Sequence, residues 1–80
     1  MRLTYDERAG VAYLRLRDDT DEVETVSSTP FRPPASDAAD DYFVLDFDAA
    51  GRLVGIEFLT PDKRLLPRVL AAAERSSRGA

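Results

Sequence analysis

Two segments of alternating side chains constrain the fold of this chain more than any other feature. Tyr42–Phe47 and Leu53–Leu59 both alternate, and the short turn Asp48–Gly51 separates them. Side chains two residues apart in a strand point to the same face of a sheet. The pattern therefore predicts a β-hairpin. Its apolar face contains Phe43, Leu45, Phe47, Val54, Ile56 and Phe58.

Two further strands are expected before this hairpin, with a third between the pairs. Arg2–Tyr5 and Val11–Arg17 flank the turn 6–10, which ends in a glycine, and they predict a first hairpin with Leu3, Leu14 and Leu16 on the apolar face. Val23–Ser28 is rich in β-branched residues and predicts a middle strand.

Residues 29–41 are expected to form one long, Pro-rich loop. Its prolines lack the N–H groups that a strand ladder needs. Asp37, Asp40 and Asp41 are expected to keep this loop in contact with water.

Helical structure is expected only after the last strand. Thr60 and Pro61 have the form of an N-cap and first helical position, and Pro67 opens a second helix that runs to about Arg75. Residues 76–80 are expected to fray. The whole is predicted to be a single domain over residues 1–75, a two-layer α+β fold. An antiparallel sheet of about five strands, two hairpins plus a middle strand, would carry the C-terminal helix packed on one face.

The composition removes most catalytic chemistry. The 80 residues include no His and no Cys. The chain therefore has no imidazole base, no thiol nucleophile, no disulfide and no thiolate or imidazole metal site. We predict no catalytic residue, no metal site and no cofactor, and hence a protein that is not an enzyme.

Charge and hydropathy limit the partners. Most acidic residues lie between positions 18 and 48, where Arg32 is the one base, and both ends of the chain are mildly basic. This distribution argues against broad binding to nucleic-acid phosphates. No apolar run is long enough to span a membrane, and Met1–Asp6 has no apolar signal-peptide core. We therefore expect a cytoplasmic protein.

Several short motifs together resemble a family of small bacterial domains of unknown function, number 2283. The resemblance covers residues 1–66 outside the Pro-rich loop, and members commonly carry Asp where this chain has Gly10. It implies a compact bacterial domain without known catalytic residues, and the proximity of members to small toxin-like genes implies a binding role as a regulatory or antitoxin-like partner. The motifs are Tyr5-Asp6, Tyr13-Leu14, Asp46-x-Asp48-x-x-Gly51, Gly55-Ile56-Glu57 and Lys63-Arg64-Leu65.

The second face of the sheet carries side chains that are large for a face in water. Either the Pro-rich loop covers this face, through Phe31, or the face is an interface for a homodimer or another protein. Edge-strand pairing with a partner is a third option. The candidate interface residues are Val11, Tyr13, Arg15, Tyr42, Val44, Leu53 and Gly55.

The same face holds a candidate polar cluster of Arg15, Asp46 and Glu57. Two nearby carboxylates can share a proton or bind a divalent cation, or Arg15 can simply neutralise one of them in a cross-strand pair. Gly55 is unusual inside a strand. Either the Tyr13 ring packs over it, or a ligand or partner backbone approaches it.

The remaining acidic residues have structural explanations. Asp6 and Asp48 each precede a turn, where a carboxylate accepts backbone N–H groups two residues on. The cluster Asp18–Glu22 lacks the glycine and the bidentate acid of an EF-hand calcium loop, so a solvated turn is expected there.

The leading hypothesis is a non-enzymatic interaction module that forms a homodimer. The rival hypothesis is a small carboxylate-dependent hydrolase or ligand-binding domain that uses Asp46 and Glu57 with a divalent metal. Nucleic-acid binding by the Arg-bearing tail ranks third.

Overall fold

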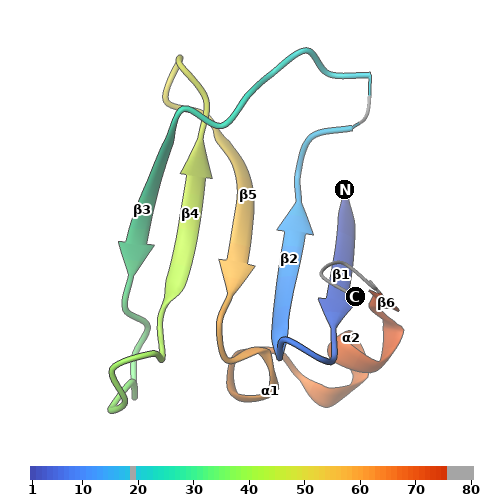
Figure 1. Ribbon diagram of the computed structural model, residues 1–80, viewed down its shortest axis with the longest axis vertical. Helices are drawn as coiled ribbons and strands as arrows, with labels where there is room; N and C mark the ends of the chain where they lie inside the picture. The colour runs from blue at the N-terminus through green and yellow to red at the C-terminus, as the bar shows by residue number, and fades with distance from the viewer. Residues whose placement is uncertain (19, 76–80) are drawn as a thin grey trace.

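A computed structural model describes residues 1–18 and 20–75. Within these residues the chain forms a six-stranded sheet in the order β3-β4-β5-β2-β1-β6 (Figure 1). The strands are β1 (Arg2–Asp6), β2 (Val11–Arg15), β3 (Ser27–Phe31), β4 (Phe43–Phe47), β5 (Leu53–Phe58) and β6 (Glu74–Arg75).

Both predicted hairpins are present. β1 pairs with β2 and β4 pairs with β5, in each case antiparallel. The turn glycines Gly10 and Gly51 have φ angles of 71° and 79°, a region that favours glycine. β2 also pairs with β5, with Leu14 opposite Ile56, and this pairing joins the two hairpins into one sheet.

The register defines two faces of this sheet. We use the name apolar face for one side, and its residues are Leu3, Ala12, Leu14, Phe43, Leu45, Phe47, Val54, Ile56 and Phe58. We use the name polar face for the other side, and its residues are Thr4, Tyr13, Arg15, Ser28, Val44, Asp46, Gly55 and Glu57.

Two strands differ from the sequence prediction. The middle strand begins at Ser27 rather than Val23 and includes Pro30, which was expected in the loop. It lies at the edge of the sheet, where a proline is tolerated because its missing N–H is not needed by a further strand. β6 was not predicted, and it pairs parallel to β1 through Thr4 and Glu74. The sheet is therefore mixed rather than antiparallel throughout.

The helical segment is shorter than predicted. α1 (Pro61–Arg64) and α2 (Pro67–Ala72) each begin with the expected proline, but α2 ends before Arg75 because Glu74–Arg75 belong to β6. Thr60 precedes α1 without a side-chain capping bond. Among the described residues, no helix is long and apolar enough to cross a membrane. The predicted frayed tail, residues 76–80, lies outside the described part of the chain.

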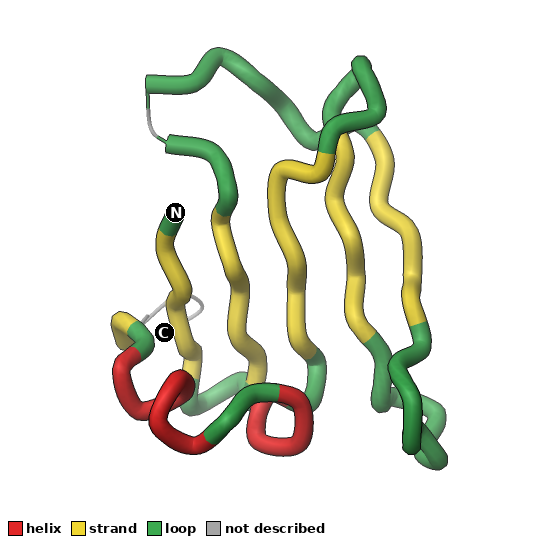
Figure 2. The backbone as a smooth tube through the Cα atoms, turned by 180° about the vertical axis from the view of Figure 1, so that it is seen from behind, coloured by secondary structure: helices red, strands yellow, loops and turns green. Residues whose placement is uncertain are grey.

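The prediction of one helix packed over a sheet face is therefore wrong. Figure 2 shows α1 and α2 in front of one end of the sheet only, beside the ends of β1 and β2. Ala12 and Phe58, which pair across β2 and β5, are buried, with 1% and 7% of their surface exposed. Phe58 packs edge-on against Phe43, with ring centroids 5.0 Å apart. Val54, near the other end of β5, is also buried, with 5% of its surface exposed.

Much of the apolar face has no helix over it. The side chains that stay only half-buried are Leu3, Leu14, Phe43, Leu45, Phe47 and Ile56. Residues of the polar face, such as Tyr13 and Val44, have the same intermediate burial. A sheet needs a second layer to bury an apolar face fully. The described residues supply that layer incompletely.

Candidate functional site

A hollow of about 590 Å³ lies on the polar face. Its basic lining consists of Arg2, Arg15 and Arg17, and its acidic lining consists of Asp46 and Glu57. Hydroxyl groups of Thr4, Tyr13, Thr25 and Ser28 complete the polar wall, and Val44 is apolar. The hollow therefore combines cations, carboxylates and hydroxyl donors on one surface.

Asp46 is held in place from two sides. The Tyr13 hydroxyl donates to Asp46 Oδ2 at 2.9 Å, and Ser28 Oγ donates to Asp46 Oδ1 at 2.7 Å. These bonds tie β2, β4 and β3 together across the hollow. Burial and the neighbouring Asp46 carboxylate both raise the pKa of the Tyr13 phenol, while the charge of Arg17 opposes this shift.

The prediction that the Tyr13 ring packs over Gly55 is confirmed. A Cβ atom placed on Gly55 would clash with Oη and Cζ of Tyr13 and would lie 3.1 Å from Cε2. Gly55 is therefore glycine because a neighbouring side chain occupies the space of a Cβ atom, and its strand conformation needs no positive φ.

The three members of the predicted polar cluster do lie together. Arg15, Asp46 and Glu57 all line the hollow, because β4, β5 and β2 are consecutive in the sheet. Glu57 lies opposite both Tyr13 and Val44 in the register. In the described part of the chain, no group of three or more carboxylates is arranged to hold a metal ion. The metal-dependent hypothesis stays a prediction.

The candidate interface residues separate into two groups. Tyr13, Arg15 and Val44 line the hollow, and Gly55 lies beneath Tyr13. The other group, Val11, Tyr42 and Leu53, is not among the described residues that line it.

Each of these outlying residues has its own position. The register shifts between Asp46 and Phe47, so Leu53 pairs with Phe47 of the apolar face and is 38% exposed. Tyr42 precedes β4, and the Arg32 guanidinium lies 5.9 Å from the centroid of its ring. Val11 begins β2 opposite Asp6. Val11 lies two residues before Tyr13, on the same side of β2. The predicted interface stays a prediction, and only part of it lines the hollow.

The turn carboxylates behave as predicted. Asp6 Oδ1 accepts the backbone N–H of Arg8 at 3.1 Å. Asp48 Oδ1 accepts the N–H of Ala50 at 3.0 Å, and Oδ2 accepts from Arg52 Nε at 2.8 Å. The backbone N–H of Arg52, which donates to Oδ1 at 2.9 Å, holds the pKa of Asp48 below its usual value together with these bonds. In the cluster Asp18–Glu22, Asp19 lies outside the described residues.

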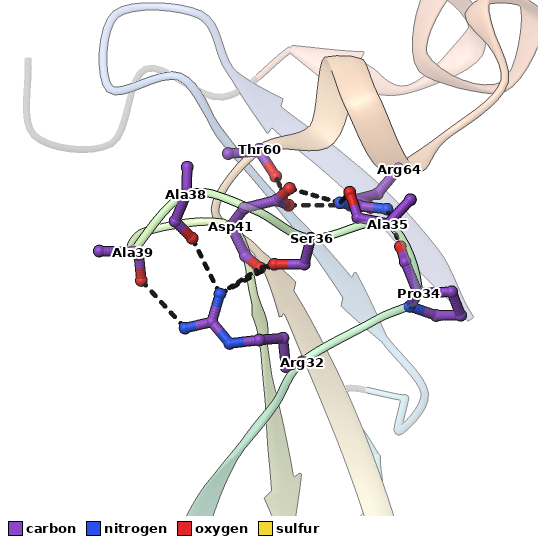
Figure 3. A network of polar contacts seen from close by, with 9 residues as sticks. All are labelled: Arg32, Pro34, Ala35, Ser36, Ala38, Ala39, Asp41, Thr60 and Arg64. Carbon is purple, nitrogen blue, oxygen red and sulfur yellow. Dashed lines mark hydrogen bonds and ion pairs between the residues drawn. The ribbon is translucent and has the colours of Figure 1, made fainter.

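Asp41 is the exception to the expectation of a wet loop, whereas Asp37 and Asp40 are exposed as expected. Only 1% of the Asp41 surface is exposed, and Thr60 Oγ1 and Arg64 Nε each donate to Oδ1 at 2.8 Å (Figure 3). Arg64 Nη2 also bonds Oδ2, and Nη1 donates to the Pro34 carbonyl at 2.9 Å. Thr60 thus binds a buried carboxylate rather than capping α1. The sequence signal was the acidic pair Asp40-Asp41 just before the strand start, together with the Lys63-Arg64-Leu65 motif.

Arg32 organises the same loop from the other side. Its Nη1 donates to Ser36 Oγ and to the Ala38 carbonyl, both at 2.8 Å, and its Nη2 donates to the Ala39 carbonyl at 3.3 Å. Arg32 and Arg64 therefore bond different backbone carbonyls of the loop around the Asp41 side chain (Figure 3). We call Arg32, Asp41, Thr60 and Arg64 the loop latch, and its many contacts indicate a structural role.

The loop latch predicts acid sensitivity. The Arg64 guanidinium lowers the pKa of Asp41 from 3.8 to about 2. Because the pKa is lower in the folded state, the stabilisation is complete above about pH 5 and is lost as the pH falls toward 2. Thermal melts between these pH values should show a falling Tm. Asp41→Asn should flatten this dependence, and an equally steep fall in that variant would contradict the assignment.

Comparison with known proteins places most of the chain in one family. The sequence model of the family described as "Protein of unknown function (DUF2283)" matches residues 2–60. The chain belongs to this family, as its motifs indicated. Searches of curated proteins and of solved structures gave no match.

Proposed function

We propose that this member of the DUF2283 family is a non-enzymatic interaction module that forms a homodimer through the apolar faces of two sheets. The observation that carries this proposal is the half-buried state of the apolar face beyond the end where α1 and α2 lie. Large apolar areas left in water are unfavourable by about 25 cal/mol per Å². A second sheet is the simplest cover for such a face.

A second copy of the chain fits this face better than a partner of a different kind. The residues of the apolar face carry no charge. A two-fold interface brings the same patch from both subunits together, so an uncharged apolar patch is complementary to itself. The sequence pattern favoured the polar face as the interface, and that face is the alternative. A dimer there would bury the arginines and carboxylates of the hollow, which is costly without precise pairing.

The size of the sheet sets the expected affinity. Five strands about 4.8 Å apart and about five residues long present a face of roughly 24 by 17 Å. This corresponds to about 400 Å² per subunit in projection, below the roughly 800 Å² of a standard interface. We therefore expect a dimer that dissociates in the micromolar range rather than an obligate one.

Replacing Leu45 with Lys should weaken the dimer strongly. Leu45 lies in the middle of β4 on the apolar face, where two copies would place like charges against each other. Dimer affinity should fall at least about tenfold, as for a central interface residue. Sedimentation velocity from about 10 µM to 1 mM measures this, a range that covers the dissociation constants expected for a small interface.

Val44→Lys is the matched control. Val44 directly precedes Leu45, has the same intermediate burial and faces the other side of the sheet. It should leave the dimer intact. Circular dichroism melts verify that both variants fold. A wild-type monomer at every concentration would overturn the proposal, and loss of the dimer only in Val44→Lys would move the interface to the polar face.

A further inference from the structure

We propose that the hollow on the polar face binds a small anionic molecule through an oxyanion, such as a phosphate or carboxylate group, with hydroxyl donors at its other end. The hollow has a volume of about 590 Å³, within the usual range of ligand sites. It faces away from the proposed dimer interface, so the two proposals stand independently.

The oxyanion would bind to Arg2 and Arg17. Arg2 pairs with Glu74 at 3.2 Å, but the two side chains are 53% and 59% exposed, and such surface pairs contribute little. Arg17 donates to the Thr25 hydroxyl at 3.4 Å, a long and therefore weak bond, and its guanidinium also interacts with the Tyr13 hydroxyl. Both guanidinium groups can thus turn to an anion at small cost. Guanidinium groups match the geometry of phosphate and carboxylate oxygens.

The opposite side of the hollow suits a hydrogen-bond donor. Asp46 is fixed by Tyr13 and Ser28, and each carboxylate oxygen can accept a further bond. Glu57 lines the same hollow, and no described residue forms a hydrogen bond or ion pair with its side-chain carboxylate. Glu57 is therefore the acceptor that most needs a donor. A ligand with an oxyanion and hydroxyl groups satisfies both sides, as a hydroxylated phosphate ester does.

The test uses isothermal titration calorimetry and backbone NMR with inorganic phosphate, glycerol 3-phosphate and malonate, at low and matched ionic strength set with chloride. Glycerol 3-phosphate should bind with saturation and shift the amides of Tyr13, Ser28 and Glu57. Malonate has no hydroxyl group, so malonate binding as strong as that of glycerol 3-phosphate would contradict the proposed ligand class. The absence of saturable shifts at these residues for all three probes would overturn the proposal.

Two variants distinguish this site from general charge attraction. Arg17→Gln should weaken binding about tenfold, as expected for a lost charge-assisted bond. Arg68→Gln is the matched control, because Arg68 is exposed on α2 away from the hollow and its loss changes the net charge equally. Equal loss in both variants would show non-specific attraction and reject the site.

Glu57→Gln tests the donor side. Removing a negative charge near the oxyanion should strengthen the binding of inorganic phosphate, because repulsion is lost. The preference for glycerol 3-phosphate over phosphate should fall several-fold, because a neutral amide accepts a weaker hydrogen bond from a hydroxyl group than a carboxylate does. An unchanged preference would remove Glu57 from the site and contradict the proposed ligand class.

Discussion

Replacing Asp41 with Ala is expected to lower the Tm by more than about 10 °C, a large effect for a domain of this size. Asp41 is buried and accepts hydrogen bonds from Thr60 and Arg64. Only 13% of the Arg64 side chain is exposed, so the substitution leaves a guanidinium charge in place with little access to water. Removing one partner of a buried ion pair destabilises the fold more than replacing both partners with apolar residues, because the remaining buried charge is uncompensated.

The loop is expected to loosen with the loss of this carboxylate. Arg64 bonds the Pro34 carbonyl and Arg32 bonds the Ala38 carbonyl, so the two arginines hold the part of the loop that precedes Asp41 at two points. Hydrogen exchange of the loop amides should be faster in Asp41→Ala than in the wild type. Within the variant, the amides of β2 and β5 should still exchange more slowly than those of the loop. Differential scanning calorimetry gives the Tm of each variant.

Asp40→Ala is the matched control for this prediction. Asp40 is the neighbouring residue, it has the same charge, and it is exposed. Its loss should shift the Tm by only a few degrees, as is usual for surface substitutions. Arg64→Lys should also destabilise, because an ammonium group cannot reproduce the planar fork that bonds two carboxylate oxygens. A Tm of Asp41→Ala close to that of Asp40→Ala would show that the loop latch contributes little.

The sequence predicted those elements whose signal is local. The alternation of Tyr42–Phe47 and Leu53–Leu59 predicted β4 and β5 because each strand buries one face. The prolines at 61 and 67 predicted both helix starts because proline suits the first helical position. Such signals need no information about the rest of the chain.

The elements that were missed depend on distant partners. β3 has the sequence Ser-Ser-Thr-Pro-Phe and is exposed throughout, so no apolar alternation identifies it. β6 has only two residues, and its pairing with β1 spans most of the chain. The same holds for the site. Asp41 and Arg64 meet because α1 follows β5 past the start of β4, and single-sequence patterns contain no record of that approach.

Part of the candidate site was predicted correctly, and one of its residues was placed on the wrong face. Arg15, Asp46 and Glu57 come together because β5 pairs with β2 on one side and with β4 on the other. Leu53 was misplaced because the register shift after Asp46 changes the phase of the alternation. A single irregular residue is enough to move a side chain to the other face.

Replacing Gly55 with Ala should lower the free energy of unfolding by about 1–3 kcal/mol, as overpacking does in a filled site. The new methyl group would occupy the space of the Tyr13 Oη and Cζ atoms, so the ring must move. Movement of the ring breaks the hydrogen bond from Tyr13 to Asp46. Chemical denaturation of the two proteins measures the loss.

A double-mutant cycle separates this steric effect from the intrinsic effect of alanine in a strand. In a Tyr13→Ala background the space is empty, so adding Gly55→Ala should cost little or should stabilise, because alanine restricts the unfolded chain more than glycine. Additive losses in the cycle would contradict the packing of Tyr13 over Gly55. The phenol supplies a second measure. Its pKa is raised by burial and by Asp46, so displacement of the ring in Gly55→Ala should return the Tyr13 titration toward its ordinary value.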